Sequence, residues 1–362
     1  MVDTLRSGWL TSGPKVSAFE EALERRLAPA WVRCISSATG GLLLGLRLAG
    51  VGRGDEVILP TLTYAACGNS VELLGAKPVF VDSEPLTGLI DLEAVEARVG
   101  PSVKAIMPVH LGGRPVDLDR VNRIRDRHGV AIVEDAAHAI GAEWRGRPIG
   151  THGNVAAFSF HASKNVTTIE GGALTLPSAE LADRVERLRF QGLSRSAWSR
   201  HETNGPADYD LDEPGFKLAM TDVSAAIGIH QLAKLDGFIE RREALAQRYD
   251  ELLEDLPLEL EPPTPDGARH ARHLYAVRVA TDAPTERDRI VARLRDRRIG
   301  SSVHFKPLHQ LRYFRERNGL GDVDFPVASD YGARTLSLPL HPAMNDDDLQ
   351  DVADALREAV GY

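Results

Sequence analysis

Short apolar runs alternate with helical patterns along the first half of the chain, and this alternation constrains the fold more than any other feature. The runs that predict buried strands are residues 56–60, 77–82, 105–110 and 131–135. Helical patterns lie between them, near residues 65–75, 91–99 and 117–128. Such alternation predicts a largely parallel sheet covered by helices on both faces. Ligands of these sheets bind at the carboxyl ends of the strands, so we expect the functional site there.

The C-terminal third predicts a second, smaller α/β unit. A long helix with one apolar side covers residues 236–256, and a proline-rich link follows at residues 260–267. One strand and two further helices are expected, at residues 275–279, 285–297 and 345–360. We therefore predict a large domain over residues 14–240 and a small domain over residues 241–362, with residues 1–13 packed beside the small domain.

Composition excludes several classes of protein. The net charge of −9 argues against a nucleic-acid partner. The two cysteines, Cys34 and Cys67, are too few for a disulfide framework or a thiolate zinc site, and we expect no metal site. No charged-then-apolar leader is visible, and no apolar run approaches the ~20 residues that a membrane span requires. These features predict a cytoplasmic protein with no membrane partner.

Lys164 lies on a polar loop between two apolar runs, VAAFSF and ALTL, that predict buried strands. Burial disfavours the charged form of a lysine and lowers its pKa, which leaves a free amine near neutral pH. A lysine that forms a Schiff base needs such an amine. The alternative is a solvated loop lysine, and from position alone that alternative is the more common one.

Two further segments combine polar residues with strand or helix ends. Residues 36–40 precede the apolar helix expected at residues 40–50, where free N–H groups attract phosphate; the alternative is a plain helix cap. Asp135 ends a buried strand, which is costly for an acid unless it is paired; the alternative is the cap of a following helix. His138 follows Asp135 by three residues, one turn further along that expected helix.

The order and spacing of many segments resemble the DegT/DnrJ/EryC1/StrS family of aminotransferases. The segments include CISSATGGLLLGL, GDEVILPTLTYAACGN, VEDAAHAIGA, SFHASKNVTTIEGG and HFKPLH. The resemblance implies the fold-type I architecture: a large domain with a mostly parallel seven-stranded sheet between helices, and a smaller α/β C-terminal domain. It also implies pyridoxal 5′-phosphate (PLP) as cofactor, with pyridoxamine phosphate as its intermediate form. Glutamate as amino donor and a homodimer with shared active sites follow from the same resemblance.

The resemblance also implies roles for residues around the cofactor ring. Lys164 would hold PLP covalently and act as general base, and Asp135 would pair with the ring nitrogen. Tyr64 would stack on the ring. His138 stands where many relatives have Gln, and it would reach the 3-hydroxyl oxygen of the cofactor.

A second set of residues would hold the cofactor phosphate. Thr39 matches the family motif, and Ala38 replaces its usual Gly. Ser159 would donate to the phosphate. Lys217 stands where many relatives have Asn, in a segment that the family extends across the dimer interface toward the neighbouring phosphate; Ala219 replaces a common Arg.

The loop around Lys164 also bears on the substrate. C-4 keto-sugar enzymes of the family tend to show SFHxxKxxTTxEGG, and this chain matches that form rather than the C-3 form SFYPxKNLGxxGDGG. We expect amination at C-4 of a dTDP- or UDP-linked 4-keto-6-deoxyhexose, for natural-product or cell-surface glycan biosynthesis. The alternatives are a C-3 keto-sugar enzyme, a cyclitol aminotransferase of the scyllo-inosose type, and a non-catalytic regulatory protein that binds PLP.

Candidate sugar or nucleotide contacts are His304, His309 and the long polar loop at residues 194–214. For each histidine a structural role is the more common outcome.

Overall fold

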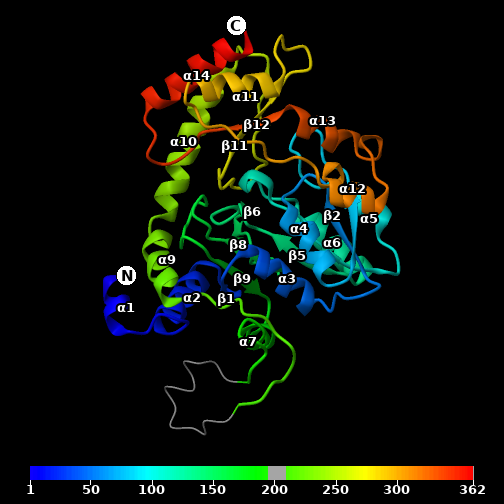
Figure 1. The fold of residues 1–362 in the computed structure, drawn as a ribbon, viewed down its shortest axis with the longest axis vertical. Helices are drawn as coiled ribbons and strands as arrows, with labels where there is room; N and C mark the ends of the chain where they lie inside the picture. The colour runs from blue at the N-terminus through cyan, green and yellow to red at the C-terminus, as the bar shows by residue number, and fades with distance from the viewer. Residues whose placement is uncertain (195–208, 362) are drawn as a thin grey trace.

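The computed structural model describes residues 1–194 and 209–361. Its centre is a seven-stranded sheet with the order β1-β9-β8-β5-β4-β2-β3 (Figure 1). The strands are β1 Trp31–Ile35, β2 Glu56–Pro60, β3 Lys77–Val81, β4 Val103–Ile106, β5 Ala131–Asp135, β8 Val155–Ser159 and β9 Gly172–Leu176. Only β9 runs against the others, because it pairs antiparallel with both β8 and β1. The prediction of a mostly parallel α/β sheet is therefore confirmed.

Every residue of β8 and β9 is buried. Since successive side chains of a strand point to opposite faces, both faces of the sheet are covered there. The run predicted as a strand over residues 105–110 is wrong at its end: β4 stops at Ile106, and only Val109 bridges to Asp135 beyond it. Pro108 interrupts the ladder because proline has no backbone N–H to donate.

Helix α3 (Ala38–Leu48) packs on β1, β5, β8 and β9. Two glycines allow this close approach. A Cβ atom on Gly41 would lie 2.7 Å from Ile35 Cδ1, and one on Gly45 would lie 2.8 Å from Val133 Cγ1. The other helices around this sheet are α2 Pro14–Arg26, α4 Ala65–Leu73, α5 Leu92–Arg98, α6 Leu118–His128, α7 Ala179–Leu188 and α9 Asp222–Leu232, with the short turn η1 Leu111–Gly113 and the ribbon β6 Glu143–Trp144 with β7 Arg147–Pro148.

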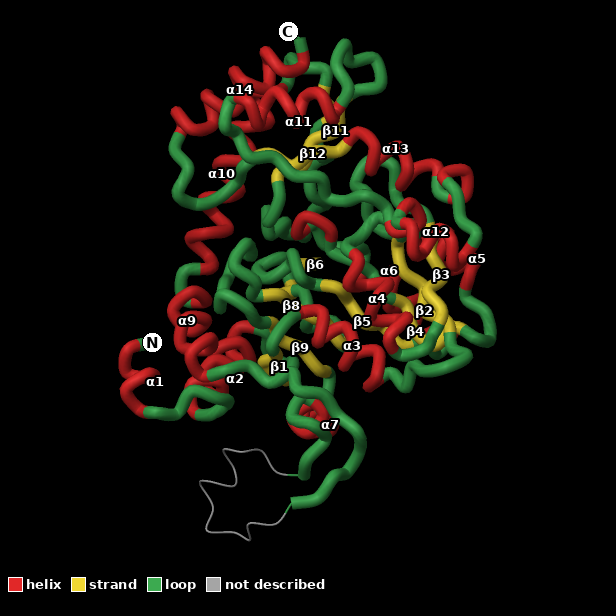
Figure 2. The backbone as a smooth tube through the Cα atoms, viewed as in Figure 1, coloured by secondary structure: helices red, strands yellow, loops and turns green. Residues whose placement is uncertain are grey.

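A separate three-stranded sheet, β10-β11-β12, forms the second unit (Figure 2). Its elements are β10 Leu258–Glu259, β11 Tyr275–Val279, β12 Thr335–Leu338, α10 Leu235–Leu253, α11 Arg287–Asp296 and α14 Asp346–Val360. Its buried apolar residues form their own cluster, which begins at Leu245, whereas Ile239 on the same helix belongs to the larger cluster. The two cores therefore meet along α10.

Two segments depart from a simple division of the chain. Helices α12 (Arg312–Asn318) and α13 (Pro326–Arg334), with the turns η2 Leu308–Gln310 and η3 Asp322–Asp324, contribute Phe314 and Phe325 to the larger core. Residues 1–13, which carry α1 (Val2–Ser7), were expected beside the small domain. Ser12 Oγ instead donates to the Met220 carbonyl, and Gly13 N–H donates to Asp222, so this segment lies against α9.

Among the described residues, none of the helices combines the length and apolar character needed to cross a bilayer. In the same part of the chain, no group of three or more His, Cys, Asp or Glu side chains is arranged to hold a metal ion.

Candidate active site

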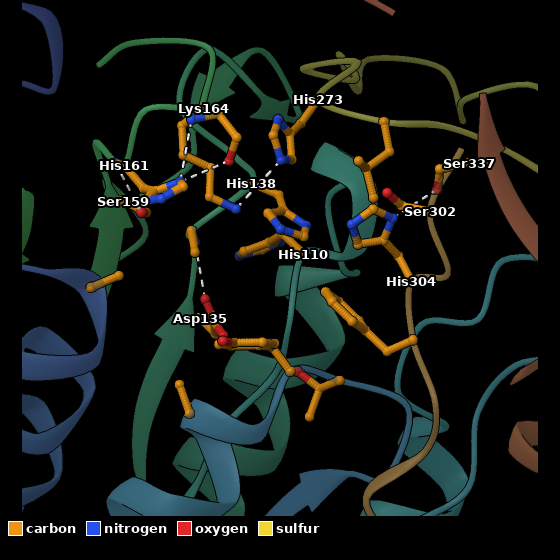
Figure 3. A pocket seen from close by; sticks show the side chains of 18 of the residues that line it. His110, Asp135, His138, Ser159, His161, Lys164, His273, Ser302, His304 and Ser337 are labelled. Atoms are coloured by element: carbon orange, nitrogen blue, oxygen red, sulfur yellow. Dashed lines mark hydrogen bonds between the residues drawn. The ribbon is translucent and has the colours of Figure 1, made fainter. Parts of the chain in front are cut away.

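A cavity of about 710 Å³ lies between the two units, where β5 and β8 end. The large unit contributes the beginning of α3 and the loop between β8 and β9, and the small unit contributes residues 300–305 and 337–340. The site thus lies at the edge of the sheet that the sequence predicted. Figure 3 shows Lys164, Asp135 and several histidines facing one another across it.

Lys164 lies on the loop that joins β8 to β9. The loop is closed at its base, because Phe160 N–H donates to the Gly171 carbonyl (2.8 Å) and Thr168 N–H donates to the Phe160 carbonyl (2.8 Å). Burial lowers the pKa of Lys164 to about 8, and the negative charge of Asp135 partly offsets that effect. The burial expected for this lysine is therefore present, and its amine is far more often uncharged at neutral pH than that of a solvated lysine.

His273 contacts the Lys164 amine, and sequence reasoning missed it. Its Nε2 lies 3.4 Å from Lys164 Nζ, and its Nδ1 lies 3.4 Å from Asn165 Oδ1. Asn165 donates through Nδ2 to the Ala271 carbonyl (2.7 Å), so its Oδ1 accepts from His273. The lone pair of Nε2 therefore faces the lysine. Burial, together with the charges of His138 and Lys164, lowers the pKa of His273 well below its usual range, so the ring is neutral.

The orientation of His138 is set by the backbone. The Gly112 N–H donates to His138 Nδ1 (3.2 Å), so the proton of the neutral ring is on Nε2. Burial and the charge of Lys164 lower the pKa of His138 well below its usual range. His138 is thus a fixed hydrogen-bond donor at neutral pH, and its ring centre lies 4.4 Å from that of His273.

Asp135 ends β5 and is 6% exposed. Its Oδ1 accepts from the Ala137 N–H (3.0 Å), and its Oδ2 accepts from Cys67 Sγ (2.9 Å). Burial raises the pKa of the Cys67 thiol well above its usual range, so Cys67 remains an S–H donor. Cys67 is a second residue that the sequence did not single out. The helix expected after Asp135 is wrong: residues 136–140 form turns, and His138 faces the cavity from a turn.

The start of α3 offers free donors to the cavity. Ser37 caps the helix by accepting from the Gly40 N–H (3.1 Å), and in the described structure the N–H groups of Ala38 and Thr39 have no acceptor. A Cβ atom on Gly172 would lie 2.8 Å from the Ala38 nitrogen, so glycine is needed where β9 passes the helix start. Ser159, at the end of β8, lines the cavity beside this helix start. Free N–H groups at a helix N-terminus and a neighbouring hydroxyl suit a phosphate.

The remaining predicted residues differ in position. Tyr64 lines the cavity but is 62% exposed. Lys217 does not line the cavity of its own chain, and its ammonium lies 4.0 Å from the ring centre of Phe190. His304 lines the cavity and bonds to Ser337 Oγ (2.9 Å).

His309 is fully buried outside the cavity, between the hydroxyl groups of Thr61 (2.8 Å) and Ser329 (2.9 Å), so it contacts no substrate there. Of the loop at residues 194–214, residues 195–208 lie outside the described part of the chain.

The family model of the DegT/DnrJ/EryC1/StrS aminotransferases matches residues 1–357. The chain belongs to this family. It is 42% identical over 362 residues to the spore coat polysaccharide biosynthesis protein SpsC of Bacillus subtilis, with 99% of this chain and 93% of SpsC covered. The resemblance drawn from the sequence motifs is therefore confirmed.

Solved structures of the family show the same fold. Spr1654 of Streptococcus pneumoniae, provisionally named a sugar aminotransferase, was solved in PLP and PMP forms. Its PMP form has a TM-score of 0.92 at 32% identity, covering 99% of this chain and 95% of that one. DesV of S. venezuelae, solved with a ketimine intermediate, has a TM-score of 0.91 at 34% identity, covering 100% of this chain and 93% of that one. The chain is thus a PLP-dependent sugar aminotransferase of fold-type I, and not a non-catalytic PLP-binding protein.

The residues of the cavity fit PLP. The free amides of α3 and the hydroxyl of Ser159 suit its phosphate, a buried carboxylate suits its ring nitrogen, and a lysine of lowered pKa suits its aldehyde.

Proposed function

We propose that the protein transfers an amino group from L-glutamate to the C-4 ketone of a nucleotide-linked 4-keto-6-deoxyhexose. The observation that carries this proposal is the loop SFHASKNVTTIEGG, which brings Lys164 into the cavity and follows the C-4 form of the family at each distinguishing position. Similarity to a spore coat polysaccharide protein supports a role in making a cell-surface glycan.

Each residue of the site has one task in this proposal. When bound, PLP supplies a ring that accepts electron density from the carbon that loses a proton. Asp135, held by the Ala137 N–H, would keep the ring nitrogen protonated, and the Nε2–H of His138 would donate to the ring oxygen. Lys164 would hold the cofactor through its amine, and the same amine would serve as the general base that moves the proton. His273 accepts a hydrogen bond from that amine and so orients it.

Phosphate binding completes the cofactor site. Thr39 and Ser159 supply hydroxyl groups, and the N–H groups of Ala38 and Thr39 supply the positive end of α3. Tyr64 lines the cavity and would stack on the ring.

We also propose a homodimer in which Lys217 reaches the phosphate in the neighbouring subunit. Lys217 lies outside the cavity of its own chain, on a segment bound to the end of β1: Ser36 N–H donates to the Leu218 carbonyl (2.6 Å). Tyr64 and Ile169, at 62% and 59% exposure, leave apolar surface for a partner to cover near the cavity.

The substrate is tested by supplying the purified enzyme with PLP, glutamate and three ketones: a nucleotide-linked 4-keto-6-deoxyhexose, its 3-keto isomer and scyllo-inosose. Aminated products are identified by mass. Because displacing the reacting carbon by about 1 Å costs ~10²-fold in rate, the 4-keto sugar should be strongly preferred. Preference for the 3-keto sugar or the cyclitol would refute the assignment, and Lys164→Ala serves as the inactive control.

A further inference from the structure

Arg242 is a buried cation on the cavity wall whose counter-charge the described structure does not contain. It projects from α10, lines the cavity and is 5% exposed. One terminal nitrogen, Nη1, donates to the carbonyls of Arg272 (3.1 Å), His273 (3.3 Å) and Leu340 (2.9 Å). Its Nε is buried without a hydrogen-bond partner. Within residues 1–194 and 209–361, no carboxylate forms an ion pair with it.

Other buried arginines of the chain are paired. Arg189 Nη1 lies 2.5 Å from Glu20, and Arg114 Nη1 lies 3.3 Å from Glu261. Burial lowers the pKa of Arg242 to about 10, which leaves the guanidinium charged at neutral pH. Burying an unpaired charge is costly. The unpaired guanidinium of Arg242 therefore indicates that an anion enters the cavity and pairs with it.

The position of Arg242 narrows the choice of anion. It holds the carbonyl of His273, the residue whose Nε2 lies 3.4 Å from Lys164 Nζ. It stands on the wall that the small unit contributes, whereas the free amides suited to a phosphate belong to α3 in the large unit. In an α-amino acid, the amine and the α-carboxylate share one carbon. A donor whose amine reacts beside Lys164 therefore carries its α-carboxylate into the same neighbourhood.

We propose that Arg242 binds the α-carboxylate of the amino donor. A guanidinium suits this task because its planar fork matches a carboxylate. The inference rests on the proposed function in one respect, namely that the donor is an α-amino acid such as glutamate. The contacts to three carbonyls hold the side chain in place before the donor arrives.

The first test separates the two halves of the reaction in Arg242→Gln holoenzyme. Glutamine keeps an N–H donor for the carbonyls but removes the charge. In single-turnover experiments with L-glutamate, the concentration for half-maximal rate should rise on the order of 10–100-fold, as expected for a lost charge-assisted hydrogen bond. The dependence on the nucleotide keto-sugar in the second half should stay unchanged. Arg241→Gln is the matched control, since Arg241 on the same helix also binds a carbonyl, that of Met344 (2.7 Å), outside the cavity.

The second test changes the donor. L-isoglutamine has an amide in place of the α-carboxylate. With wild-type enzyme, its concentration for half-maximal rate should exceed that of L-glutamate by the same factor that Arg242→Gln causes with L-glutamate. In Arg242→Gln, replacing L-glutamate by L-isoglutamine should raise that concentration little further. L-glutamine has an amide in place of the γ-carboxylate. Replacing L-glutamate by L-glutamine should raise the concentration for half-maximal rate by similar factors in the wild-type enzyme and in Arg242→Gln. Three results would each overturn the proposal. They are a loss in Arg242→Gln that depends on the γ-carboxylate, a glutamate dependence that is unchanged in Arg242→Gln, and a slower half-reaction with the keto-sugar in that variant.

A binding measurement tests the role of Arg242 even if the proposed reaction with glutamate is wrong. Glutarate, a dicarboxylate without an amine, should bind wild-type holoenzyme in a calorimetric titration and bind Arg242→Gln at least tenfold more weakly. If wild-type enzyme fails to react with glutamate, the proposed donor is wrong, and the glutarate titration still decides whether Arg242 binds a carboxylate. If Arg242→Gln does not fold, Arg242→Lys, which keeps the charge but loses the fork, should show a smaller loss of the same sign.

Discussion

The amine of Lys164 should titrate near pH 8 in the cofactor-free protein, more than two pH units below an ordinary lysine. The cause is burial, and the charge of Asp135 opposes it. With a pKa of about 8, roughly a tenth of the amines are uncharged at pH 7, against about 0.04% for a lysine with a pKa near 10.4. The uncharged fraction is therefore about 200-fold larger, and this fraction is the form that reacts with an aldehyde.

The assay is trace acetylation of the cofactor-free protein with acetic anhydride between pH 6 and pH 11, followed by peptide mass analysis. The extent of labelling at Lys164 should rise to half its maximum near pH 8. Lys104, which is exposed, reports the reagent available at each pH. A midpoint at or above about pH 10 would refute the claim that burial controls this amine.

The same labelling experiment tests how Asp135 affects the pKa of Lys164. A carboxylate nearby favours the charged lysine, so it raises the pKa of Lys164. Asp135→Asn should remove that contribution and move the labelling midpoint below its wild-type value. A midpoint that moves up instead would show that the two groups are not coupled as described.

In turnover, Asp135→Asn should cost on the order of 10²–10⁴-fold in steady-state rate, because the ring nitrogen loses its charged partner; near-normal turnover would reduce Asp135 to a structural residue. Cys67→Ala should lower turnover about tenfold, since Asp135 loses a buried donor, whereas Cys67→Ser keeps one; Cys34→Ala is the control, and equal rates for both alanine variants would contradict the role of the thiol. Lys217→Ala should weaken PLP retention, measured by dialysis, and mixing it with Lys164→Ala subunits should restore some activity; no recovery despite proven subunit exchange would count against a shared site.

The parts of the site that were predictable from sequence are those that local pattern specifies. Asp135 ends a strand and Ala38 begins a helix, so the carboxyl edge of a parallel sheet brings them together without any long-range information. Lys164 follows from the loop between two buried strands. The strand predicted over residues 105–110 was too long. The prediction used apolar character alone, whereas Pro108 lacks the backbone N–H that a strand needs for pairing.

The residues that were missed lie far along the chain from the residues that they contact. Cys67 lies 68 positions from Asp135, and His273 lies 109 positions from Lys164. A lone cysteine or histidine in a sequence is more often structural, so only the folded chain shows what each one faces. His309 was a candidate substrate contact for which a structural role was the more common outcome, and the structure shows that role: the hydroxyl groups of Thr61 and Ser329 bond to its ring in the core.

The histidines around Lys164 explain why the lysine amine, and not a histidine ring, carries the proton at neutral pH. His138, His273 and His304 all have pKa values lowered by burial, to about 4 for His304, and the charge of Lys164 adds to the effect on each of them. None of the three therefore competes for a proton at neutral pH. Their hydrogen bonds have fixed directions instead: His138 donates through Nε2, and His273 accepts at Nε2. An amine that titrates near pH 8 among neutral rings is left to carry the proton, while the rings hold their partners in place.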